Sequence, residues 1–153
     1  MREVEVVGVR VEMPTNQPLV LLRETEGSRY LPIWIGAVEA SAIAYAHQGT
    51  ATVRPLTHEL MQHIVESLGD ELDEVRIVDV KDGIFFALLV FASGAEVEAR
   101  PSDSFALALR AGARIVCTED VLDEAGIAST TEEDAEVEKF REFLDDVEPE
   151  DFE

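Results

Sequence analysis

Residues 97 to 112, VEARPSDSFALALRAG, place three chemically capable side chains close together: Arg100, Ser102 and Asp103. A guanidinium can hold two oxygens of a phosphate group, and a carboxylate can bind a divalent metal ion or accept a proton. The three residues stand where an alternating strand pattern changes into an Ala- and Leu-rich helix pattern. The residue types suit phosphodiester chemistry at the junction between a strand and a helix.

A second stretch, RPLTH at residues 54 to 58, has a similar order: Arg54 precedes a proline, and Thr57 and His58 follow. Imidazole titrates near neutral pH and can therefore act as a general base. Glu39, in the helical pattern GAVEASAIAYAHQG, adds another carboxylate. Hydrolysis of a phosphodiester needs charge stabilisation on the phosphoryl oxygens, an oriented water and, commonly, carboxylates that hold a metal ion. Together the two stretches and Glu39 supply all these residue types.

The same residues also have structural roles open to them. Thr57 and either Ser102 or Asp103 are ordinary helix N-caps, which satisfy free backbone N–H groups. The two arginines can pair with a neighbouring carboxylate, Glu39, Asp103 or Glu98, and so fix the joint between sheet and helix. The residue types alone leave both readings open.

The elements that must position these residues form one α+β domain over residues 1–127, with a mixed, largely antiparallel sheet and packed helices. The first strand is expected to carry a bulge near Val6 and Val7, because the apolar positions change phase there. The strand IFFALLVFA is expected to be central, because it is apolar on both faces. Helices are expected at residues 36–49, 57–68 and 103–112, and the second has one apolar face made by Leu60, Met61, Ile64, Val65 and Leu68.

Two of the expected helices share a local pattern. The segment EASAIAY begins at Glu39 and DSFALAL begins at Asp103, so an acid opens each of the two Ala-rich segments. Such self-similarity can mark a weak internal duplication. Chance similarity between two Ala-rich helices explains it equally well, and the sequence does not decide between these origins.

Charge is concentrated at the C-terminal end. The chain of 153 residues has a formal net charge of -21, and residues 119–153 contain 16 acidic and two basic residues, a net charge of -14. We expect residues 128–153 to form an acidic C-terminal tail, helical in part. Its apolar stripe is Val137, Phe140, Leu144 and Val147. A field of this sign argues against a general polyanion-binding surface.

Segments that cross membranes or direct secretion are not evident. The longest apolar run, residues 84 to 92, is far shorter than the ~20 residues of a membrane-spanning helix. The N-terminus alternates like a strand and has no signal-peptide pattern, so we expect a cytoplasmic protein that does not enter a membrane. The single cysteine, Cys117, lies in the apolar segment RIVCT and is expected to be buried and inert.

Four segments resemble the bifunctional nuclease domain family: LPIWIGAVEASAIA, RPLTHELM, VKDGIFFALLV and EARPSDSFALALRAGARIVCTEDVL. The resemblance covers most of residues 1 to 127 and implies an α+β domain that self-associates. DNase and RNase activity is attributed to some members of the family. The positions that match its motifs are Glu39, Arg54, Thr57, His58, Arg100, Ser102 and Asp103.

The first functional hypothesis is a nuclease that hydrolyses phosphodiester bonds of DNA and RNA with the help of a metal ion. Its catalytic residues would be Glu39, His58 and Asp103, with Glu39 and Asp103 as ligands of Mg²⁺ or Mn²⁺. Its substrate-binding residues would be Arg54, Arg100, Thr57 and Ser102. The alternative is a non-enzymatic, self-associating regulatory or binding module. Both imply a homo-oligomer without a nucleotide or organic cofactor.

Overall fold

The computed structural model describes residues 1–12, 16–49 and 53–128. The strands in these ranges are β1 (Arg2–Glu12), β2 (Gln17–Glu24), β3 (Arg29–Trp34), β4 (Leu72–Lys81), β5 (Ile84–Phe91), β6 (Glu96–Ala99), β7 (Arg114–Cys117) and β8 (Ile127–Ala128). The helices are α1 (Ala37–Gln48), α2 (Thr57–Ser67), α3 (Pro101–Ala111) and α4 (Glu119–Ala125). The acidic helix expected in the tail lies outside the described residues.

The strands form one sheet with the order β6-β5-β4-β7-β1-β2-β3-β8. The pair β4–β7 is parallel, and the other neighbouring pairs are antiparallel. The α+β class and the mixed, largely antiparallel sheet are therefore confirmed. The register of β1 against β2 shifts between Val6 and Gly8, which confirms the predicted bulge.

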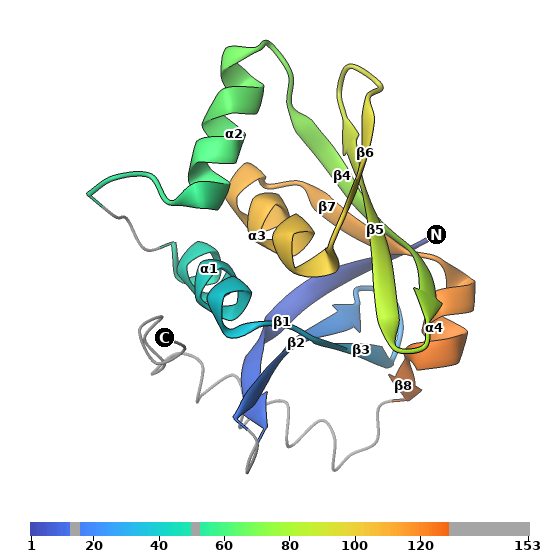
Figure 1. The fold of residues 1–153 in the computed structure, drawn as a ribbon. Helices are drawn as coiled ribbons and strands as arrows, with labels where there is room; N and C mark the ends of the chain where they lie inside the picture. Colours follow the sequence, from blue (N-terminus) through green and yellow to red (C-terminus); the bar gives the residue numbers. More distant parts are fainter. Residues whose placement is uncertain (13–15, 50–52, 129–153) are drawn as a thin grey trace.

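The described chain contains the same order of elements twice, because a three-stranded meander is followed by a helix each time. The strands β1, β2 and β3 precede α1, and β4, β5 and β6 precede α3. The helices α1 and α3 lie side by side over the sheet, while α4 lies apart from them near β3 and β8 (Figure 1). Glu39 and Asp103 are each the third residue of their helix. The sequence repeat thus places two acids at equivalent positions in adjacent helices.

The core lies between these helices and the sheet. α3 is its most deeply packed helix, and Phe105 is fully buried with apolar side chains from several strands around it. The expectation that residues 84–92 form the central strand is wrong: β5 is next to the edge strand β6, and only Ala87 and Leu89 of it are buried. Most apolar side chains of β5 are therefore only partly buried.

The predicted N-caps are also wrong. The N-cap position of α2 is Leu56 and that of α3 is Arg100, and neither makes a side-chain cap hydrogen bond. Pro101 takes the first helical position of α3, where the missing N–H costs nothing and the fixed φ suits a helix. The helix therefore starts before Ser102 and Asp103, and capping does not account for either side chain.

Ion pairs attach α4 to the edge of the sheet. Arg29 of β3 contacts the carboxylate of Glu24, and its Nη1 and Nη2 lie 2.7 Å from Asp123 Oδ1 and 2.9 Å from Glu119 Oε2. Arg2 of β1 also bonds Glu119. Hydrogen bonds from Arg29 and then Arg2 lower the pKa of Glu119 from 4.5 to about 2. The contacts with the two arginines therefore favour the ionised form of Glu119.

We expect Glu119→Gln to flatten the acid limb of the stability profile. A carboxylate with a lowered folded-state pKa stabilises the fold above its unfolded pKa, and this contribution disappears as the pH falls toward the folded value. The window runs from 4.5 down to about 2. Thermal melts over this range should show a steeper loss of stability in the wild type than in the variant. Parallel profiles would show that the pair with Arg29 contributes nothing.

Burial also accounts for the state of the lone cysteine. Cys117 lies within β7 and is fully buried. Desolvation raises the pKa of its thiol to about 12, so the thiolate is suppressed at neutral pH. Cys117 is a core side chain, as expected from the apolar segment around it.

Across residues 1–12, 16–49 and 53–128, the helices fall short of the length and apolarity that crossing a bilayer requires.

Candidate functional site

Three helix N-termini bring four of the sequence-predicted residues into one cluster. Glu39 comes from the first turn of α1, His58 from the first turn of α2, and Arg100 and Asp103 from the start of α3. Arg100 Nη2 lies 3.0 Å from both Glu39 Oε1 and Asp103 Oδ2. His58 Nε2 lies 2.9 Å from Asp103 Oδ1. We call these four residues the helix-start cluster.

Arg100 is the part of the cluster most open to solvent. Its side chain is 66% exposed, whereas those of Glu39, His58 and Asp103 are 17%, 12% and 28% exposed. The hydrogen bond with Asp103, followed by the charges of Asp103 and Glu39, raises the pKa of Arg100, so the guanidinium stays charged. A molecule that approaches from solvent therefore meets this cation first.

The contact with Asp103 orients the ring of His58. An ionised carboxylate only accepts hydrogen bonds, so the proton of a neutral ring is assigned to Nε2 from this contact. The other nitrogen, Nδ1, is then able to accept a proton. A carboxylate in this position also stabilises the imidazolium that forms when the ring takes up a proton. The pair has the arrangement of a general base with its orienting acid.

The donor types for a divalent metal are present, but the geometry does not gather them as ligands. Arg100 lies between Glu39 and Asp103, and one oxygen of Asp103 is taken by His58. In the part of the chain that the structure describes, no three His, Cys, Asp or Glu side chains are placed to share a metal ion. A requirement for Mg²⁺ or Mn²⁺ therefore stays a prediction.

An open groove of about 450 Å³ adjoins the helix-start cluster at Arg100, whereas Glu39, His58 and Asp103 do not line it. Arg100, Pro101 and Ser102 form one part of its wall, and the start of β5 and the end of β3 form others. In Figure 1 the turn between β4 and β5 lies beside β3, which brings these distant segments together. The groove gives a substrate access to the exposed guanidinium.

Trp34 is a groove residue that the sequence-based site assignment left out. It is the last residue of β3, it is 53% exposed, and it lines the groove together with Arg100. Its neighbours Ile33 and Ile35 are buried. The sequence could have predicted this exposure, because alternate residues of a strand face opposite sides and Trp34 stands between two apolar residues. Without the fold, however, nothing placed Trp34 beside Arg100.

The other three predicted residues occupy different surroundings. Ser102 is buried and lines the groove. Thr57 is exposed as the first residue of α2. Arg54 is exposed in the segment that leads into that helix. The substrate-binding roles of these three residues stay predictions.

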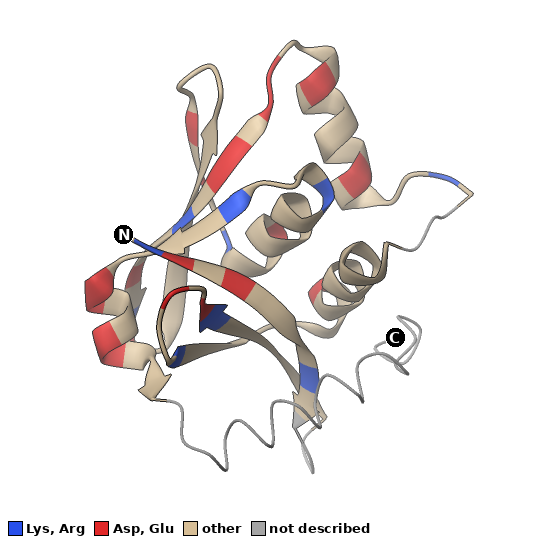
Figure 2. Ribbon diagram, turned by 180° about the vertical axis from the view of Figure 1, so that it is seen from behind, with Lys and Arg blue, Asp and Glu red and all other residues tan. Residues whose placement is uncertain are grey.

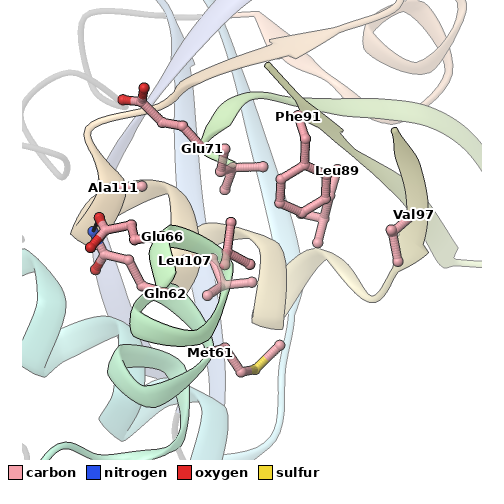
Figure 3. Close-up of a pocket in the computed structure, with 11 residues that line it drawn as sticks. Met61, Gln62, Glu66, Glu71, Leu89, Phe91, Val97, Leu107 and Ala111 are labelled. Carbon is pink, nitrogen blue, oxygen red and sulfur yellow. Dashed lines mark hydrogen bonds between the residues drawn. The ribbon is translucent and has the colours of Figure 1, made fainter. Parts of the chain in front are cut away.

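A second, apolar pocket lies between α2, α3 and the strands β4 to β6. It has a volume of about 170 Å³, and Figure 3 shows Met61 and Leu107 on the helices with Leu89, Phe91 and Val97 on the strands. It contains none of the seven predicted site residues. Its lining suits packing against apolar groups more than chemistry on a phosphate.

The distribution of charge offers little long-range attraction for nucleic acid. In Figure 2 the basic residues of the described chain stand as separate positions among more numerous acidic ones. A polyanion bound here would depend on local contacts such as the one that Arg100 can make.

Comparison with known proteins places the chain in a family. The model of the bifunctional nuclease domain matches residues 20–130. Two uncharacterized proteins of Mycobacterium tuberculosis, from strains CDC 1551 and H37Rv, are each 53% identical over 161 aligned positions. Each alignment covers 99% of this chain and 98% of the relative. The chain, with its α+β fold and its cluster of helix-start residues, therefore belongs to the bifunctional nuclease domain family.

Proposed function

We propose that the protein is a nuclease that hydrolyses phosphodiester bonds of DNA and RNA at the helix-start cluster. The observation that carries this proposal is the convergence of Glu39 and His58, each from another helix, on the Arg100–Asp103 pair beside an open groove. Membership of the bifunctional nuclease domain family supports the reaction type. The contacts among the four side chains give the proposal a physical basis besides the family match.

In the proposed reaction, Arg100 receives the scissile phosphate. The guanidinium has contacts with two carboxylates and an exposed side, and it can hold phosphoryl oxygens on that side. A water molecule attacks phosphorus while His58 Nδ1 takes its proton, and the imidazolium is stabilised by Asp103. One P–O bond forms and another breaks, and the departing oxygen takes back a proton from the imidazolium. Glu39 keeps Arg100 in place.

The sequence leads us to expect Mg²⁺ or Mn²⁺ at Glu39 and Asp103, but Arg100 lies between their carboxylates, so metal dependence is tested separately from these steps. The test is cleavage of end-labelled single-stranded DNA and RNA by highly purified protein in Mg²⁺, in Mn²⁺ and in excess chelator. Cleavage in any of these conditions supports nuclease activity, and its loss in chelator supports the metal. Intact substrates under all three conditions would overturn the proposal.

A second candidate function, a self-associating binding module, is favoured by how α2 is attached. On the side of α2 that faces α3, three contacts are polar: His58 bonds Asp103, Glu59 lies 3.6 Å from Arg110, and Gln62 donates a hydrogen bond to the carbonyl of Arg110. No residue of α2 is buried. The helix thus gains little from burial within its own chain.

The opposite side of α2 carries an exposed apolar stripe. Its residues follow one another at intervals of four, which is one helix face, and they are 41%, 49%, 49% and 81% exposed: Leu56, Leu60, Ile64 and Leu68. We infer that a second copy of the chain covers this stripe, because an isologous two-fold contact pairs a surface with itself. Complete burial of an exposed Leu or Ile contributes about 1.5–3 kcal/mol, and covering these partly exposed side chains would contribute a share of that.

We expect Ile64→Glu to shift the protein from a dimer toward a monomer, since each copy would place a charge in the apolar contact. Light scattering coupled to gel filtration measures the change. Val38→Glu is the matched control, because Val38 is 79% exposed on α1 and lies outside the stripe. A wild type that is monomeric at all concentrations, or dimerisation that Ile64→Glu leaves unchanged, would contradict the assignment.

A further inference from the structure

We propose that the groove beside the helix-start cluster binds single-stranded nucleic acid by stacking an unpaired base on the indole of Trp34. The inference rests on the proposed nuclease function and names the form of substrate that the site accepts. It commits to a strand with exposed bases, whether DNA or RNA, and excludes the intact duplex from the groove.

The groove combines a surface for a base with a contact for a phosphate. Trp34 and Ile84 are 53% and 63% exposed and come from β3 and β5, on different walls. Exposed apolar side chains that adjoin one another can mark a ligand-binding groove. Arg100, which holds two carboxylates and keeps an exposed side, lines the same groove. A nucleotide has matching parts, because its base is flat and apolar on both faces and its phosphate is anionic.

The electrostatics favour base stacking over phosphate attraction as the main source of affinity. The carboxylates of Glu39 and Asp103 partly neutralise Arg100. Both acids also stand in the first turns of α1 and α3, where they offset the positive ends of the helix dipoles. A ligand recognised by charge alone would be held weakly here. Stacking does not depend on net charge, and every base offers a π-face.

The proposal selects single strands because of how bases are presented. In a duplex each base is stacked on both sides, so its face is not available to a side chain at the protein surface. In a single strand the bases can turn outward onto an aromatic platform. The volume of about 450 Å³ lies in the range of small-ligand sites. It suits a nucleotide or two, and the rest of the strand would lie outside.

Trp34 is the only tryptophan of the chain, so intrinsic fluorescence reports on this position alone. The full-length protein is titrated with four probes of equal length: oligothymidylate DNA, oligouridylate RNA, an abasic DNA strand and a DNA duplex. We expect the two base-bearing single strands to quench the emission, and the abasic strand and duplex to leave it nearly unchanged. The two single-strand arms show whether DNA or RNA is preferred.

Binding of labelled single strands by Trp34 variants gives the second readout. Trp34→Ala is expected to weaken binding roughly 5- to 150-fold, which corresponds to one stacked base, and Trp34→Phe should restore most of the affinity. With Arg100 as the main phosphate contact, the logarithm of the affinity should fall with the logarithm of salt concentration with a slope of about −0.7. Trp34 is at the surface, so its replacement leaves the core intact.

The outcomes separate this inference from the proposed function. Cleavage by Trp34→Ala with the KM of the wild type, together with wild-type emission that the single strands do not quench, would overturn the stacking proposal and leave the nuclease proposal standing. Quenching and binding without cleavage by the wild type would support stacking and overturn the nuclease. If the tryptophan emission changes with protein concentration but not on addition of any probe, Trp34 lies in a contact between two copies of the chain. That result would overturn the stacking proposal.

Discussion

Replacing Asp103 with asparagine is expected to lower the rate of phosphodiester cleavage by roughly 10²–10⁴-fold, the contribution typical of general acid–base catalysis. The amide keeps the shape of the side chain, but it removes the charge that stabilises the imidazolium of His58. It can also reverse the hydrogen bond, because an amide N–H₂ donates where a carboxylate accepts. His58 would then hold its proton on the wrong nitrogen. Initial rates on labelled single-stranded RNA and DNA measure the effect.

The matched control for this variant is Asp73→Asn, which removes the same charge from an exposed position on β4. Its cleavage rate should equal that of the wild type. The change in net charge is identical in the two variants, so a general electrostatic effect on substrate approach would appear in both. Equal activity of Asp103→Asn and the wild type would remove Asp103 from the catalytic assignment.

The second large effect is on stability. Phe105→Ala is expected to reduce the free energy of unfolding by about 3–5 kcal/mol, because it removes a fully buried ring and leaves a cavity under α3. For a chain of this size the loss corresponds to a fall in Tm of roughly 6–20 °C. α3 also carries Arg100 and Asp103, so cleavage should fail at the lower temperature at which this helix loses its packing.

Val38→Ala is the control for the stability prediction. Val38 is 79% exposed on α1, and its truncation should change the free energy of unfolding by about 0.5 kcal/mol or less. Chemical denaturation of both variants gives the comparison. A loss below about 1 kcal/mol for Phe105→Ala would mean that α3 is not the helix on which the core is built.

Much of the fold followed from local patterns in the sequence. Alternation predicted the strands, and the change of phase near Val6 and Val7 predicted the bulge in β1. The fold class was predictable because each strand and helix carries its own period. The position of β5 in the sheet was not, because an apolar run of this length fits an internal strand anywhere in the sheet.

Helix starts were predicted less well than helix interiors. Thr57 and Asp103 have good capping side chains, yet the caps are Leu56 and Arg100. Capping preferences are worth only about 1 kcal/mol, so the tertiary contacts of a residue can override them. Asp103 instead bonds its neighbour Arg100 and also His58, which is 45 residues away in the sequence.

The candidate site was predictable in residue type but not in geometry. The sequence indicated that Glu39, His58, Arg100 and Asp103 have suitable side chains, whereas their contacts depend on the packing of α1, α2 and α3. The amphipathic pattern of α2 likewise shows that it has an apolar face, but not which residues of this face line the pocket beside α3 and which stay exposed. Both features depend on which helices and strands pack against each other, and local sequence patterns do not specify that packing.

A double-mutant cycle tests whether Asp103 acts through His58: cleavage rates are compared for His58→Ala, Asp103→Asn, the double variant and the wild type. If Asp103 acts through His58, the double variant should cleave within about threefold of the rate of His58→Ala, because the second substitution removes nothing further. Losses that multiply in the double variant would mean that Asp103 acts independently of His58. Equal rates in all four proteins would mean that neither residue takes part in cleavage.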